Sequence, residues 1–78
     1  MVAFTIAARD GSAIEFGYGC DNGVPGTRCG GQHHGRSTSW YRIPGGEWEC
    51  HRRSMHWLKS IAEVSDSAEE FVQLVEME

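Results

Sequence analysis

The sequence predicts one small α+β domain over residues 1–78, in which two antiparallel β-hairpins form a small sheet and one or two C-terminal helices pack on one face. Three observations predict this class. Two early segments show apolar alternation with period two, a second alternating pair flanks a Pro-Gly-Gly turn, and after residue 54 the apolar spacing becomes helical.

The first predicted hairpin joins residues 2–8 to residues 13–18. A two-residue Asp-Gly turn would set apolar side chains opposite polar ones. A three-residue loop instead sets Ile6 opposite Ile14 and keeps all the large apolar residues on one face. It also places Gly11 at the left-handed position of a type I turn with a bulge, so we predict this register.

The segment from Cys20 to Arg36 predicts no regular element, because it holds five glycines and one proline and Val24 is its only large apolar residue. A structureless loop of this length in a compact domain is usually functional, held by a disulfide or a metal ion, or disordered. We therefore expect this segment to bind a partner and not to catalyse a reaction.

The second predicted hairpin joins residues 37–43 to residues 47–53 around Pro44-Gly45-Gly46. Pro44 suits the first turn position, and Gly46 is expected to be the left-handed residue that leaves the turn. This register sets Trp40 opposite Cys50.

The same register sets Arg42 opposite Trp48, so that the guanidinium lies against the indole ring. Trp40, Trp48 and Cys50 share a face that we expect to be inward. The outer face is expected to carry Glu47, Glu49, Tyr41 and Ile43.

Two helices are predicted after the hairpins. Met55, Leu58, Ile61 and Ala62 recur at helical spacing after a plausible N-cap, Ser54, although the β-branched residues of 57–64 also allow a strand. In the second helix, Asp66 or Ser67 is the expected N-cap, acidic residues occupy the first turn, and the apolar stripe is Ala68, Phe71, Val72 and Val75.

Charge is distributed unevenly along the chain. Residues 1–60 hold all seven basic residues and five acids, whereas residues 61–78 hold six acids and no base. This asymmetry bears on partners and encounter rates. No run of about 20 apolar residues, the length that spans a bilayer, is present. The odd count of three cysteines favours a cytoplasmic protein with reduced thiols, unless one pair forms.

The cysteines and histidines suggest a metal site. Cys20, Cys29, His33 and Cys50 supply three thiolates and one imidazole, a known tetrahedral zinc set, and a Zn²⁺ ion would tie the glycine-rich segment to the second hairpin. Only Cys29 and His33 have the short spacing typical of zinc ligands. The alternatives are that Cys50 packs as a small apolar residue and that Cys20 and Cys29 are free or paired.

Two further chemistries remain open. Cys29 with His33 or His34 has the residue types of a cysteine-dependent enzyme, a thiolate beside a base. The arginines of residues 28–53, interleaved with aromatic residues, have the composition of a nucleic-acid-binding surface. Overall acidity counts against nucleic acid. Only Gln32 and Asp21 lie near enough in the sequence to orient the base of an enzyme.

We therefore expect a small non-catalytic protein-binding module, and the candidate binding residues are Arg36, Tyr41, Arg42, Glu69, Glu70 and Glu76. In its shortness, acidity and lack of motifs the chain resembles the small inhibitors that phages carry against host defence, such as anti-CRISPR proteins. That likeness of class implies an inhibitor of a larger complex. A zinc-stabilised module that binds nucleic acid or protein is the alternative, and a homodimer is left open by the predicted edge strand.

Overall fold

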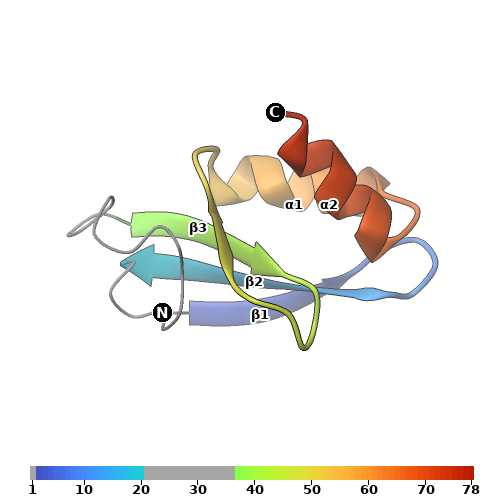
Figure 1. The fold of residues 1–78 in the computed structure, drawn as a ribbon, viewed down its shortest axis with the longest axis horizontal. Helices are drawn as coiled ribbons and strands as arrows, with labels where there is room; N and C mark the ends of the chain where they lie inside the picture. The colour runs from blue at the N-terminus through green and yellow to red at the C-terminus, as the bar shows by residue number, and fades with distance from the viewer. Residues whose placement is uncertain (1, 21–36) are drawn as a thin grey trace.

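The computed structural model describes residues 2–20 and 37–78, and it confirms the α+β arrangement. Two hairpins join into one antiparallel sheet with the strand order β1-β2-β3-β4, and both helices cover the same face of it (Figure 1). The elements are β1 (Val2–Ala7), β2 (Ala13–Cys20), β3 (Ser37–Arg42), β4 (Glu49–His51), α1 (Met55–Val64) and α2 (Ala68–Glu76).

The register of the first hairpin is as predicted. Ile6 pairs with Ile14 and Phe4 with Phe16, so the large apolar residues of β1 and β2 share one face. Gly11 has a φ of 88° and donates its N–H to the carbonyl of Ala8 over 2.9 Å. A three-residue loop with a left-handed glycine therefore sets which side chains of this hairpin point toward the helices.

The pairing of β2 with β3 decides which face of the second hairpin is inward. Phe16 lies opposite Tyr41 in this ladder, and Tyr41 is 5% exposed within the core under the helices. Side chains alternate along a strand, so Trp40 points to the opposite face of the sheet. The predicted face assignment is therefore wrong, because Tyr41 is the inward ring and Trp40 is buried outside the core cluster.

Within the second hairpin the predicted register is correct but the turn differs. Trp40 pairs with Cys50, and the guanidinium carbon of Arg42 lies 4.5 Å from the centre of the Trp48 ring. The left-handed residue is Gly45, with a φ of 87°, and not Gly46. Proline followed by a left-handed glycine is typical of a type II turn, in which the third residue, not the fourth, needs positive φ.

Both C-terminal segments are helical, which resolves the helix-or-strand alternative for residues 57–64. Ser54 caps α1 as predicted, since its hydroxyl accepts the N–H of Trp57 over 3.2 Å. Ser67 caps α2 by accepting the N–H of Glu70 over 3.0 Å. These hydroxyls satisfy main-chain donors that have no partner within the helix.

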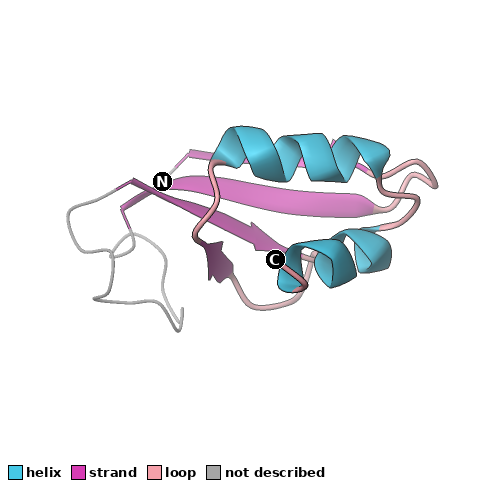
Figure 2. Ribbon diagram, turned by 90° about the horizontal axis from the view of Figure 1, so that it is seen from above, coloured by secondary structure: helices cyan, strands magenta, loops and turns pink. Residues whose placement is uncertain are grey.

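The core forms where α2 crosses the sheet. The buried ring of Phe71 meets Phe16 of β2 and Tyr41 of β3 edge-on, with ring centres 5.4 Å and 5.6 Å apart. Leu58 and Ala62 bring the inner side of α1 into the same cluster. Seen from above, α1 lies along the β1 side of the sheet and α2 lies toward β3 (Figure 2).

The turn of the first hairpin binds the link between the two helices through main-chain groups. The N–H groups of Arg9 and Asp10 donate to the carbonyls of Ser65 and Asp66 over 3.0 Å and 2.9 Å. The hydroxyl of Ser12 accepts the N–H of Ala68, at the start of α2, over 2.8 Å. The turn of the first hairpin therefore orients α2 on the sheet, although the two segments lie more than fifty positions apart in the sequence.

Candidate interaction surface

The outer surface of α2 combines exposed apolar and acidic side chains. Leu74 is 39% exposed and Met77, the C-cap residue of α2, is 83% exposed. Glu69 and Glu76 are also exposed on α2, on the other side of Met77 from Leu74, and no basic group of the described residues pairs with either of them. We call these four residues the α2 surface.

The other two acids of this region have structural partners. Glu70 accepts the main-chain N–H of Asp66 over 3.0 Å while its own N–H bonds to Ser67, which completes a reciprocal cap. Glu78 pairs with Arg53 over 2.9 Å and with Arg52 over 3.5 Å. The predicted binding residue Glu70 therefore has a role in holding the start of α2, whereas no ion pair or side-chain hydrogen bond to another described residue engages Glu69 or Glu76.

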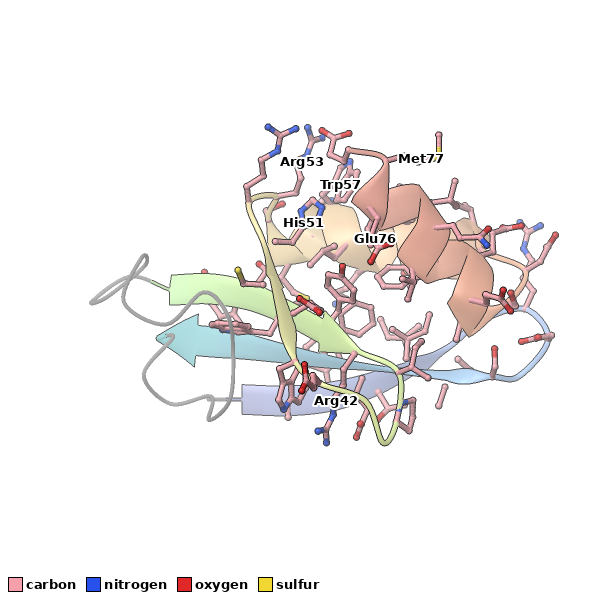
Figure 3. All side chains as sticks on the ribbon, viewed as in Figure 1. Arg42, His51, Arg53, Trp57, Glu76 and Met77 are labelled. Atoms are coloured by element: carbon pink, nitrogen blue, oxygen red, sulfur yellow. The ribbon has the colours of Figure 1, made fainter. Side chains whose placement is uncertain are left out.

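An arginine and aromatic cluster holds the C-terminal end of α2 against the chain after β4. The Arg53 guanidinium carbon lies 4.6 Å from the centre of the Trp57 ring, and the His51 and Trp57 rings stack with centres 5.2 Å apart (Figure 3). Arg52 and Arg53 bring positive charge to Glu78, next to the negative end of the α2 dipole. This offsets the unfavourable position of that acid.

Both ring nitrogens of His51 have hydrogen-bond partners. Nδ1 accepts the N–H of Arg53 over 3.1 Å, so it carries no proton in this arrangement. Nε2 therefore carries the proton and donates it to the carbonyl of Val75 over 2.9 Å. The neutral imidazole links the end of β4 to the last turn of α2, and it leaves no lone pair for a metal ion.

Arg42 lies on the sheet face away from the helices (Figure 3). Its Nε donates to Glu15 over 2.7 Å, and its guanidinium covers the Trp48 ring. Because the guanidinium is already bound to a carboxylate and an indole, its affinity for a phosphate is reduced. Of the other two predicted binding residues, Tyr41 is buried and offers no exposed group. Arg36 lies outside the described residues.

Cys50 is disulfide-bonded, which is the exception that the expectation of reduced thiols allowed. A sulfur in a disulfide is not the thiolate that zinc binds, so the disulfide and the predicted metal site are mutually exclusive uses of Cys50. The Cys20 side chain, Cys29, His33 and His34 lie outside the described part of the chain. Within that part, no three metal-ligating side chains are grouped.

Comparison with known proteins adds no relationship. A scan against family models found no match, and neither the search of curated proteins nor that of solved structures found a similar chain. Among residues 2–20 and 37–78, no helix is long and apolar enough to cross a membrane.

Sequence reasoning missed Leu74 and Met77 as candidate binding residues. A signal was present, because both are large apolar residues that lie off the stripe of Phe71 and Val75. The arginine and aromatic cluster had no such signal. Its members come from β4, the link between β4 and α1, α1 and Glu78, and only the folded chain brings them together.

Proposed function

We propose that this protein is a small binding module, of the kind that inhibits a larger assembly, and that the α2 surface is its contact with a partner protein. The observation that carries the proposal is the exposure of Leu74 and Met77 on the same helix as two carboxylates that pair with no basic group within residues 2–20 and 37–78. Buried apolar anchors with a charged rim are the usual anatomy of a protein–protein contact.

The same chemistry defines the partner. Glu69 and Glu76 favour a basic surface, and the two apolar side chains favour a hollow in that surface that excludes water from them. The acid pair would mainly raise the association rate, whereas the apolar pair would set the lifetime of the complex. A basic protein surface that ordinarily holds nucleic acid has this character, and blocking it would inhibit its owner.

The test uses the immobilised chain and four variants. Proteins retained from an extract of the source cells are compared between the wild type, Leu74→Ser, Met77→Ser, the double variant Glu69→Gln/Glu76→Gln, and the control Glu63→Gln. Glu63 is an exposed acid on α1, outside the α2 surface. Glu70 is not changed, because its loss would also weaken the cap of α2.

A protein retained by the wild type and by Glu63→Gln, but lost with either apolar variant, is then purified, and its affinity is measured by calorimetry. We expect each apolar change to weaken binding about tenfold or more. We expect the double acid variant to slow association and to abolish most of the dependence on salt. Retention that is equal for all four variants would eliminate the α2 surface as the contact.

A further inference from the structure

The free edge of β1 has the features of a site for strand addition. β1 is one border of the sheet formed by the described strands, and its residues 2–7 contain neither a charged side chain nor a proline. Exposed edge strands usually carry charges, prolines or bulges that prevent pairing with another chain. The other border, β4, is only three residues long and includes Glu49 and His51.

The hydrogen bonds of the turn identify the unpaired main-chain groups on this edge. The N–H of Ala8 donates to the carbonyl of Ser12, and the carbonyl of Ala8 accepts the N–H of Gly11, so Ala8 directs both groups toward the hairpin. These directions alternate along an antiparallel strand. Ala3, Thr5 and Ala7 therefore direct their N–H and C=O groups away from β2, and all three residues are exposed.

The position of α1 selects the kind of occupant. α1 packs on β1 and lies along it in the view from above (Figure 2). Two β1 strands paired about 4.8 Å apart would bring two copies of α1 to a similar separation. Packed helices need about 8–10 Å between their axes. Antiparallel pairing with a second copy, which places both α1 helices on the same face, is therefore disfavoured, whereas a bare extended segment fits beside β1 next to α1.

A charge beside the edge adds chemical specificity. The ammonium of Lys59 lies 5.6 Å from the centre of the Phe4 ring, and no carboxylate of the described residues pairs with it. Phe4 and Ile6 are only half-buried on the same side of the sheet. A strand added to β1 would therefore meet two apolar side chains and one free cation on the side of the helices.

We propose that the β1 edge binds an extended segment of a partner protein as a fifth strand. Its main chain pairs with Ala3, Thr5 and Ala7, its apolar side chains contact Phe4 and Ile6, and one carboxylate approaches Lys59. Main-chain pairing supplies the affinity in this mode of recognition, and the alternate side chains supply the specificity. The site is separate from the α2 surface.

The probe is a displayed library of random peptides of about ten residues, long enough for one strand. Selected peptides are synthesised and titrated into the ¹⁵N-labelled full chain. We expect the amide protons of Ala3, Thr5 and Ala7 to exchange more slowly with solvent in the complex, because they gain acceptors. We expect the amides of Phe4 and Ile6, already bonded within the hairpin, to change little.

Thr5→Pro removes one outward donor and leaves the β1–β2 ladder intact, because proline is tolerated where the N–H of an edge strand faces solvent. It should weaken binding at least about tenfold relative to Thr5→Val, which keeps the N–H and the branched shape. Lys59→Gln should weaken binding of the acidic peptides alone. Leu74→Ser should leave all the peptides bound, which separates this site from the α2 surface.

Failure to select any peptide would overturn the proposal. So would selected peptides whose binding leaves the exchange of Ala3, Thr5 and Ala7 unchanged. The exchange measurement uses the wild-type chain and therefore decides the matter even if Thr5→Pro does not fold.

Discussion

Replacing Ser12 by alanine tests whether the first hairpin turn positions α2. The Ser12 hydroxyl accepts the N–H of Ala68 over 2.8 Å and donates to the Asp10 carboxylate over 2.6 Å. The Ala68 N–H belongs to the first turn of α2, where no carbonyl of the helix can accept it. Removing the hydroxyl leaves this part-buried donor without its acceptor.

The expected cost follows from the type of bond. Loss of a capping oxygen costs about 0.5–2 kcal/mol, and an unsatisfied buried donor costs about 1–3 kcal/mol. We therefore expect Ser12→Ala to lower the free energy of unfolding by about 1–2 kcal/mol. In a domain of this length each 1 kcal/mol lowers Tm by about 4–8 °C.

Urea unfolding followed by circular dichroism measures the difference, with Ser60→Ala as the matched control. The Ser60 hydroxyl is exposed and donates only to the carbonyl of Trp57 in its own helix. Its loss should change stability by no more than about 0.5 kcal/mol. If Ser12→Ala were as stable as Ser60→Ala, the contact between the turn and α2 would not contribute to folding.

Three more predictions concern stability. Phe71→Ala should lower the free energy of unfolding, measured with urea, by about 3–5 kcal/mol because it leaves a cavity at the centre of the core. Leu74→Ala, at an exposed position of the same helix, should lower it by less than about 1 kcal/mol. Hydrogen bonds from Ser12 lower the pKa of Asp10, so this carboxylate stabilises the fold above the ordinary carboxyl pKa of about 3.9, and the contribution is lost as the pH falls through the lowered value. Asp10→Asn should therefore unfold with a shallower dependence on acid pH than the wild type, and identical profiles would contradict the assignment. His51→Ala should lower the free energy of unfolding by about 1–3 kcal/mol and speed amide exchange in the last turn of α2. Unchanged exchange there would show that the imidazole does not hold the helix.

The first hairpin was predictable because two independent signals agreed. Only one register placed Ile6 and Phe4 opposite apolar partners, and the same register gave Gly11 a left-handed position. A slip of one residue would expose the whole apolar face, so the observed register is much more stable than the alternative. Ser54 and the helical spacing after it were predictable for the same reason, since cap and periodicity agreed.

The second hairpin shows where local patterns stop being sufficient. Both of its faces carry aromatic residues, so alternation alone does not say whether Trp40 or Tyr41 points toward the helices. The answer comes from the pairing of Phe16 with Tyr41, which joins strands separated by a long connection. The same holds for Glu78, because its partners lie on the chain between β4 and α1.

The contact of Trp57 with His51 and Arg53 gives the molecule a natural optical reporter. An indole in contact with a ring and a guanidinium changes its emission when either one moves away. His51 is also hydrogen-bonded to the last turn of α2, so a ligand that shifts that turn would alter the fluorescence of Trp57. Engagement at the helix end can thus be followed without attaching a dye, as a change in the summed emission of the three tryptophans.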